Sequence, residues 1–186
     1  MTNDFPVRAA VADDAPALAA LVNSAYRGDS SRAGWTTEAD LLGGQRVDAE
    51  RLADDIATPG HVVLLHEVAG QPVACVHLER TTPDGCYLGM LTTQPTLQAR
   101  GLGRRMLQAA ETWAATTWGT RSVHMTVIAV REELIAYYER RGYVRTGERR
   151  PFPYDDPRFG LPRVEGLEFV VLRKTLAPST PQASGA

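Results

Sequence analysis

The sequence predicts an α+β fold of the α/β three-layer kind, in which helices flank a mixed central β-sheet. Three observations point to this class. Apolar residues first recur at helical spacing, then β-rich segments are joined by tight turns, and finally helix and strand patterns alternate. The 186 residues suit one domain. We expect this domain to span residues 1–176 and the small, polar residues of the tail 177–186 to be disordered.

The first third of the chain predicts one short strand and three helices. The strand is Val7–Val11, and the first helix follows two carboxylates that favour a helix start. A second helix is capped by Thr36 or Thr37 and ends at Leu42, before two glycines. The third is Asp48–Ala57, closed by a Pro-Gly pair. The apolar residues of the first helix recur at helical spacing: Leu18, Leu21, Val22 and Tyr26.

The middle of the chain predicts an antiparallel meander. Its strands are His61–Val68, Pro72–Thr81 and Cys86–Thr93, which are separated by short turns that contain glycine. Helical spacing returns after Pro95. The remaining elements are a helix from Leu102 to about Thr117, a strand Ser122–Ala129, a helix Glu132–Arg141, and strands Tyr143–Arg149 and Leu167–Leu176 on either side of a loop rich in Pro and Asp, Pro151–Gly166.

Composition and charge exclude several classes of protein. The 20 Lys and Arg residues against 22 Asp and Glu give a net charge of −2, which argues against a protein that coats nucleic acid. No apolar run reaches the roughly 18 residues of a membrane helix, and acidic residues stand where a signal peptide would be basic. We therefore expect a cytoplasmic protein with no membrane partner. Cys75 and Cys86 lie too far apart on paired strands to form a disulfide, and no histidine pair has metal-ligand spacing, so we expect no metal.

The segment between Thr93 and Arg105 gives the clearest chemical signal. It runs from a strand through a glycine turn into a helix, and backbone N–H groups at a helix start have no partner inside the helix. Gly101 and Gly103 let the backbone approach an anion closely, and three arginines add positive charge. This pattern favours a pyrophosphate site. Met106 stands where a dinucleotide fingerprint needs its third glycine, and no Gly-Lys-Ser/Thr P-loop occurs.

Two motifs resemble those of the GCN5-related N-acetyltransferase (GNAT) superfamily. Gln98-Ala-Arg-Gly101-Leu-Gly103 is similar to its pyrophosphate loop, and Tyr138-Glu-Arg-Arg-Gly142-Tyr143 is similar to its Tyr-Glu-x-x-Gly-Phe/Tyr helix end. The order of elements from Val7 to Leu176 agrees with that fold. The resemblance implies an acetyl-CoA-dependent N-acetyltransferase whose central sheet is splayed between its fourth and fifth strands.

The resemblance also assigns roles to residues. It implies that the pantetheine arm of acetyl-CoA lies along the strand backbone near Met90, Leu91 and Thr93, and that Tyr138 approaches the thioester sulfur. Two departures from the family pattern are present: Arg131 replaces an Asn that often contacts CoA, and the strand Tyr87–Thr93 lacks the Glu that many members use as a base. The residues implied at the pyrophosphate are Gln98, Ala99, Arg100, Gly101, Leu102, Gly103 and Arg104.

Direct acetyl transfer to an amine needs a proton donor for the leaving sulfur and a proton acceptor for the amine. Helical spacing places Tyr138 on the core side of its helix and turns Tyr137 about 100° away, so Tyr137→Phe is expected to change little. Glu79 and His77 share one face of a strand and are the first candidates for the base. His124 and ordered water are alternatives.

The acceptor is expected to be a primary amine of a small molecule or a peptide. Trp35–Glu38 lies where the family places acceptor-binding helices. A loop with Phe152, Tyr154 and Phe159 could close over a cationic amine, although loops of this kind more commonly pack their aromatic rings on their own scaffold. The arginines between 140 and 150 are expected to form a solvated face, with no nucleic-acid partner. The resemblance is compatible with a homodimer. Two other functions stay open: a CoA-binding module without turnover, and an acyltransferase that uses another acyl-CoA or a hydroxyl nucleophile.

Overall fold

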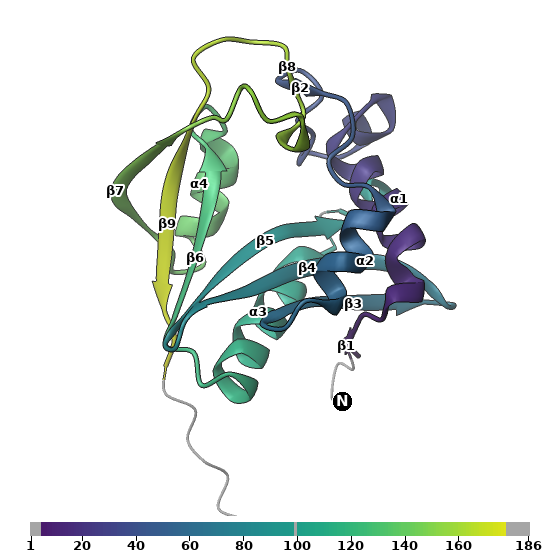
Figure 1. The fold of residues 1–186 in the computed structure, drawn as a ribbon, viewed down its shortest axis with the longest axis vertical. Coiled ribbons are helices and arrows are strands. Elements are labelled where there is room, and N and C mark those ends of the chain that lie inside the picture. The colour runs from purple at the N-terminus through teal and green to yellow at the C-terminus, as the bar shows by residue number, and fades with distance from the viewer. Residues whose placement is uncertain (1–4, 99, 178–186) are drawn as a thin grey trace, which may run out of the picture.

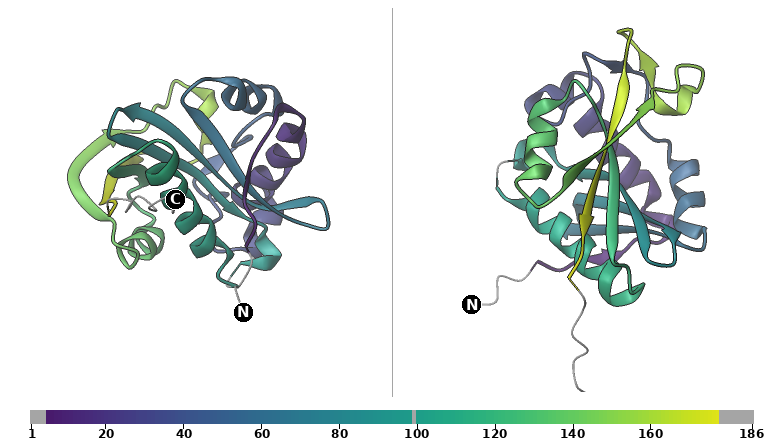
Figure 2. Two further views of the ribbon diagram at one scale, coloured as in Figure 1. Left: turned by 90° about the horizontal axis from the view of Figure 1, so that it is seen from below. Right: turned by 90° about the vertical axis from the view of Figure 1, so that its left-hand side faces the viewer.

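The computed structural model describes residues 5–98 and 100–177 and places them in a seven-stranded sheet with helices on both faces (Figures 1 and 2). The order across the sheet is β1-β3-β4-β5-β6-β9-β7. β5 and β6 run parallel and every other neighbouring pair runs antiparallel, which confirms the mixed sheet. Its strands are β1 (Arg8–Ala9), β3 (His61–Val68), β4 (Gln71–Thr82), β5 (Gly85–Thr93), β6 (Ser122–Ile128), β7 (Val144–Pro151) and β9 (Glu168–Thr175).

The α-helices of the described residues cover the two faces of the sheet. α1 and α2 lie on one face, and α3 and α4 lie on the other (Figure 2). Side chains that alternate along a strand pack against the helices on opposite faces of the sheet. Leu78 and Leu88 pack towards α3 and α4. Val63 and Leu65 pack towards α1. The helices are α1 (Ala15–Tyr26), α2 (Ala49–Ala57), α3 (Leu102–Thr117) and α4 (Glu132–Glu139), with short 3-10 turns at Ala12–Asp14, Asp29–Ala33, Pro95–Leu97 and Pro157–Phe159.

Local signals explain where the helices begin and end. The Asp48 carboxylate accepts a hydrogen bond from the Arg51 amide at 2.7 Å, which caps the start of α2. Gly142 follows α4 with φ of +89°, a conformation that glycine adopts without a Cβ penalty. These signals are local in the sequence, so the predicted helices 48–57, 102–117 and 132–141 are confirmed to within two residues.

The helix predicted from Thr36 or Thr37 to Leu42 is wrong. Leu42–Gly43 forms a short strand, β2, which pairs with β8 (Leu161–Pro162) inside the predicted loop Pro151–Gly166. The two-stranded ribbon joins the loop after α1 to the loop before β9.

Contacts with α1 and its following turn explain the missing helix. The Thr37 hydroxyl accepts the Ala39 amide at 3.2 Å, as a cap would, but it is also hydrogen-bonded to the Ser31 hydroxyl in the turn after α1. The Glu38 amide donates to the Tyr26 carbonyl at 3.0 Å, at the end of α1. These hydrogen bonds hold the segment against the end of α1, where residues 39–41 form a turn and do not extend into a helix.

Other expectations concern the cysteines, the tail and membranes. Cys75 and Cys86 are both buried and free, as predicted. Ala99 and residues 178–186 of the predicted tail lie outside the described residues. None of the helices in the described ranges combines the length and apolar character needed to cross a membrane.

Replacing Leu78 by Ala tests the core assignment. Leu78 is fully buried between the sheet and α3, so the change should lower the free energy of unfolding by about 2–5 kcal/mol. Urea unfolding followed by circular dichroism measures it. Val144→Ala, on a β7 side chain that is 63% exposed, should cost less than about 0.5 kcal/mol. Equal stability of the two variants would contradict the assignment.

Candidate active site

β5 separates from β6 after only three paired residues. The parallel ladder consists of Gly85–Ser122, Cys86–Val123 and Tyr87–His124. Figure 1 shows the two strands starting side by side and then diverging. The predicted splay between the fourth and fifth strands of the sheet is confirmed. Beyond Tyr87, no strand ladder holds β5 on the β6 side.

β5 also bends where it leaves β6. Its register with β4 shifts beyond the pair of Gly89 and His77. Met90 has φ of +55°, in the left-handed region that residues with a Cβ rarely adopt. The next carbonyl, that of Leu91, accepts a hydrogen bond from the Tyr26 hydroxyl at 2.6 Å. The end of β5 is therefore fixed by α1 as well as by β4.

α3 begins beside the end of β5. Gly101 caps it with φ of +78° in open surroundings, so a side chain there would cost backbone strain and not a clash. The Arg105 amide donates to the Gly101 carbonyl at 3.1 Å. The amides of Leu102, Gly103 and Arg104 come before it and have no partner inside the helix. Free amides at a helix start suit an anion, and the pyrophosphate site predicted from the glycine turn would lie here.

Gln98 has a structural contact that the sequence did not predict. Its side-chain oxygen accepts the Trp35 amide at 2.9 Å, and its side-chain nitrogen donates to the Thr36 hydroxyl at 2.9 Å and the Thr93 carbonyl at 3.3 Å. The side chain therefore ties the segment around Trp35 to the end of β5. The Gln98 amide donates to the Pro95 carbonyl at 3.4 Å, so neither group is free to face an anion. Arg100 is exposed beside the helix start.

A small cavity of about 30 Å³ lies where these elements meet. It joins the end of β5, the start of α3 and the last turn of α4, and it has room for about two water molecules. The cavity brings together the predicted residues Leu91, Thr93, Gly103 and Tyr138. Its other lining residues are Tyr26, Trp35, Thr36, Leu134 and Tyr137.

Tyr138 lies on the core side of α4 and is only 6% exposed. Burial, as the largest cause, raises the pKa of Tyr138 well above its ordinary value of 10. Its hydroxyl therefore keeps its proton at neutral pH. No group of the described residues forms a hydrogen bond with this hydroxyl, so it is free to donate to a molecule in the cavity.

Tyr137 was expected to be turned about 100° from the core side of α4 and to serve as a control, but it lines the same cavity as Tyr138. Its ring lies 5.1 Å from Trp35, and the Arg141 guanidinium covers it at 3.4 Å from the ring centre. The Tyr137 hydroxyl is 3.2 Å from the position that a Cβ on Gly103 would take. Tyr137 lies about 100° around α4 from Tyr138 and so faces the start of α3. Because Gly103 of α3 lines the same cavity, Tyr137 remains part of the site. Tyr137→Phe is therefore not a neutral control.

A second, larger cavity of about 1200 Å³ adjoins the bend of β5. Met90 lines this cavity, whereas the next residue, Leu91, lines the small one. The Tyr87 ring covers Gly89, where a Cβ would come within 2.7 Å of a ring carbon, and its hydroxyl is 3.2 Å from the Thr126 hydroxyl on β6. Tyr87 thus spans the start of the splay at the floor of the large cavity.

The two predicted bases, His77 and Glu79, both line the large cavity, together with His124. The ring nitrogens Nε2 of His77 and Nδ1 of His61 are 3.1 Å apart. Burial first, and the His61 charge second, lower the pKa of His77 to about 4. His77 is therefore neutral at pH 7 and can accept a hydrogen bond. None of these side chains shares the small cavity with Tyr138.

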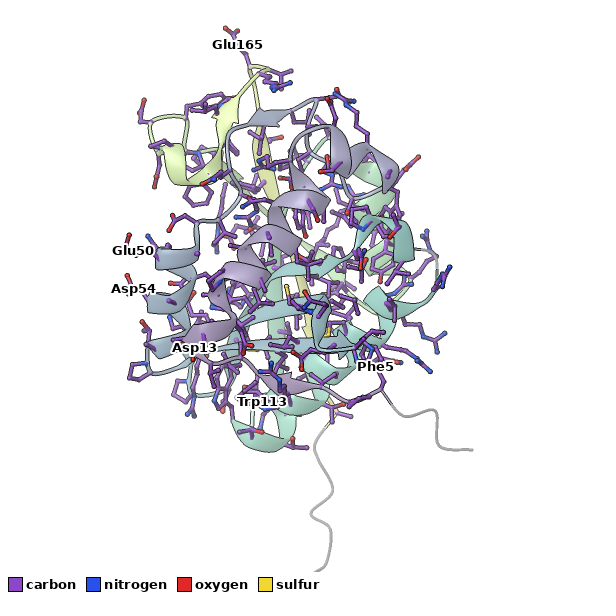
Figure 3. The ribbon with its side chains drawn as sticks, turned by 90° about the vertical axis from the view of Figure 1, so that its right-hand side faces the viewer. Phe5, Asp13, Glu50, Asp54, Trp113 and Glu165 are labelled. Carbon is purple, nitrogen blue, oxygen red and sulfur yellow. The ribbon has the colours of Figure 1, made fainter. Side chains whose placement is uncertain are left out.

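The walls of the large cavity differ in chemistry. One wall, from residues 44–55, includes α2, and Figure 3 shows Glu50 and Asp54 projecting from the same side of this helix. The other wall is the loop before β9, where Phe159 and Leu161 face the cavity. Phe152 is buried against its own scaffold, which is the more common arrangement expected for this loop, and Tyr154 does not line the cavity. Five carboxylates and three arginines line the cavity: Asp48, Glu50, Asp54, Asp55, Glu79, Arg46, Arg51 and Arg150.

The arginines between 140 and 150 do not form an open basic patch. Arg145 pairs with Glu132 and Glu139, and Arg149 pairs with Glu168. Because acidic partners neutralise Arg145 and Arg149, this part of the surface agrees with the solvated face that was expected.

Solved acetyltransferases share this fold. The ribosomal-protein-S18-alanine N-acetyltransferase from Escherichia coli superposes with a TM-score of 0.69 at 15% identity, over 96% of this chain and 98% of that one. The ribosomal-protein-alanine N-acetyltransferase from Brucella melitensis gives 0.68 at 20% identity, over 92% and 100%. The yncA protein of Salmonella typhimurium, solved with its cofactor acetyl-CoA, gives 0.67 at 19% identity, over 97% and 99%.

The fold is thus the splayed-sheet fold of these solved acetyltransferases. The model of the acetyltransferase (GNAT) family matches residues 21–143 of this chain. The protein belongs to the GNAT family of acetyltransferases. A comparison with curated proteins found no match in sequence.

The lowered pKa of His77 predicts sensitivity to acid. In the unfolded chain His77 titrates near 6.5, so between pH 6.5 and about 4 the unfolded state binds more protons than the folded state. Stability should fall by about 3 kcal/mol as the pH drops through this window. The charged and titratable groups that act on the pKa of His77 are His61, Asp55 and Arg46.

Urea unfolding at pH 7.5 and pH 4.5 measures this loss. His77→Gln should lose clearly less stability between the two values than the wild type, because glutamine does not titrate. An equal loss in both proteins would show that His77 is not the group responsible.

Proposed function

We propose that the protein transfers an acetyl group from acetyl-CoA to a primary amine by direct attack. One observation carries this proposal: Tyr138, Gly103 and the end of β5 line one narrow cavity, and a large cavity with His77 and Glu79 adjoins the same bend of β5. A thioester at the bend could be reached by a hydroxyl from one cavity and by an amine from the other.

The start of α3 suits the pyrophosphate of acetyl-CoA. The amides of Leu102, Gly103 and Arg104 point from a helix N-terminus, and the exposed Arg100 and Arg104 add positive charge. The pantetheine arm would follow the backbone near Met90, Leu91 and Thr93. The Leu91 carbonyl is occupied by the Tyr26 hydroxyl, so other backbone groups of this segment have to serve the arm.

The small cavity also limits how the arm can enter. A volume of about 30 Å³ holds about two water molecules, which is less than a pantetheine arm needs. Half-buried Tyr137 and exposed Trp35 lie over the cavity and belong to different elements. We therefore expect these two rings to shift when the arm binds.

Tyr138 suits the leaving sulfur. A leaving thiol has a pKa of about 8.5 if it behaves like cysteine. Since the pKa of Tyr138 lies well above 10, its hydroxyl stays protonated and donates a hydrogen bond to the departing sulfur. A backbone amide at Met90 or Leu91 would stabilise the tetrahedral oxyanion.

The acceptor amine does not need a strong base from the protein in this proposal. His77, with a pKa near 4, is too weak a base to remove a proton from an alkylammonium ion directly. His77 and Glu79 can accept hydrogen bonds from the amine and orient it, while ordered water takes its proton. The excess of carboxylates over arginines in the large cavity favours a cationic acceptor, and Phe159 and Leu161 favour one with an apolar body.

Turnover with a library of primary amines tests the proposal. Acetyl-CoA is supplied with each amine, and thiol release and acetylated product are both measured. Product from acetyl-CoA supports the N-acetyltransferase. Binding of CoA without product from any acyl-CoA favours a module without turnover, and product only from a longer acyl-CoA or a hydroxyl acceptor favours the other acyltransferase.

Gly103→Val should weaken CoA binding at least tenfold. A Cβ at Gly103 lies 3.2 Å from the Tyr137 hydroxyl, so valine would crowd the helix start and the narrow cavity. Isothermal titration calorimetry measures the Kd. Gln108→Val places the same side chain on the exposed face of α3 and should bind CoA like the wild type. Normal binding by Gly103→Val would mean that CoA binds elsewhere.

Tyr138→Phe should lower kcat by roughly 10- to 1000-fold and leave the Kd for CoA nearly unchanged, because only the hydroxyl contacts sulfur. Steady-state kinetics and calorimetry measure the two quantities. Tyr143→Phe is the matched control: it also removes a buried hydroxyl, one that donates to Glu111 at 3.0 Å, and should affect stability more than kcat. Wild-type turnover by Tyr138→Phe would make Tyr138 a packing residue.

A further inference from the structure

A buried cluster of three charged side chains lies between α1 and α4. The two carboxylate oxygens of Glu38 each accept a different guanidinium: Oε2 pairs with Arg27, and Oε1 pairs with Arg131 at 3.1 Å. The side chains of Arg27, Glu38 and Arg131 are 5%, 11% and 9% exposed. Burying three charges is costly unless their geometry is well defined, so the cluster fixes the segments that carry them.

The three residues come from the segments that enclose the small cavity. Arg27 directly follows α1, and Glu38 follows the segment of Trp35 and Thr36 that lines the cavity. Arg131 is the N-cap residue of α4, which carries the lining residues Leu134, Tyr137 and Tyr138. The cluster therefore joins the two sides of the cavity.

The cluster is also connected to the bend of β5. The Glu38 amide donates to the carbonyl of Tyr26, whose hydroxyl donates to the Leu91 carbonyl. Arg27 reaches the Phe159 carbonyl at 3.4 Å, on the wall of the large cavity. Hydrogen bonds through Tyr26 and Glu38 thus link the end of β5 to Arg131 at the start of α4, where β5 and β6 no longer pair.

The position of Arg131 on α4 determines what it can hold. Arg131 and Tyr138 are seven residues apart, which is about two helical turns, so they fall on nearly the same side of the helix. α4 has only eight residues, and Tyr138 is in its last turn. Fixing the N-cap of so short a helix therefore limits its rotation and sets the direction of the Tyr138 ring.

We propose that Arg131 is a positioning residue that acts through Glu38 to hold the Tyr138 hydroxyl at the reacting thioester. The inference rests on the proposed function of Tyr138 as the hydrogen-bond donor. Arg131 faces Glu38 and does not line the small cavity, so its contribution to turnover passes through α4 and not through contact with the substrate.

A double-mutant cycle of Arg131→Met and Tyr138→Phe tests this role. Arg131→Met leaves the pair of Arg27 and Glu38 intact, with one charge of each sign, so we expect it to fold. Kinetics use acetyl-CoA and the amine with the highest turnover in the library. In the wild-type background Arg131→Met should lower kcat about tenfold and change the KM for acetyl-CoA less than twofold. In the Tyr138→Phe background it should lower kcat less than twofold.

Two further variants complete the design. Arg131→Lys keeps a charged donor for Glu38 and should recover most of the lost kcat. Arg32→Met removes the exposed ion pair with Asp40, in the same segment as Glu38, and should leave kcat unchanged. If Arg131→Met does not fold, Arg131→Gln takes its place in the cycle with the same expectation.

The outcomes separate the inference from the proposed function. Equal losses of kcat in the two backgrounds, or no loss in either, would overturn the positioning role of Arg131 and leave the role of Tyr138 intact. Full turnover by Tyr138→Phe alone would overturn the proposed role of Tyr138, and the inference with it.

Discussion

The loss of pairing between β5 and β6 after Tyr87 and His124 is the constraint on which the site depends. Two parallel strands that stop pairing leave backbone groups that need other partners. Here the partners come from outside the sheet, since the Tyr26 hydroxyl takes the Leu91 carbonyl. The same separation lets α3 start, and α4 end, beside the strand. Two cavities therefore adjoin one bend of backbone, and each offers a different chemistry.

The two cavities give the leaving sulfur and the acceptor amine of the proposed reaction different electrostatic environments. The narrow cavity is closed by aromatic rings, which keep the Tyr138 hydroxyl protonated by burial. The large cavity is polar on one wall and apolar on the other, and burial keeps His77 neutral beside it. A helix N-terminus adds positive potential at the far end of the narrow cavity. Such a division suits a reaction in which an acetyl group passes from a charged carrier to an amine and the carrier leaves as a thiol.

Much of the fold and part of the site could be predicted from the sequence, because their signals are local. Strand alternation, the glycine turn at Gly101 and the apolar spacing of α3 each depend on neighbouring residues. The segment after Thr36 could not be predicted, since Glu38 is drawn into an ion cluster with Arg131, which is 93 residues away. Gln98 and Tyr137 were misjudged for the same reason: their partners, Trp35 and Gly103, come from other elements.

A crystal structure with acetyl-CoA tests the central claim most directly. The account predicts the pyrophosphate at the amides of Leu102–Arg104, the arm between the diverging ends of β5 and β6, and the sulfur within hydrogen-bonding distance of the Tyr138 hydroxyl. The rings of Trp35 and Tyr137 should be shifted from the positions seen without it. Acetyl-CoA bound away from the splay, with the narrow cavity unchanged, would contradict the account.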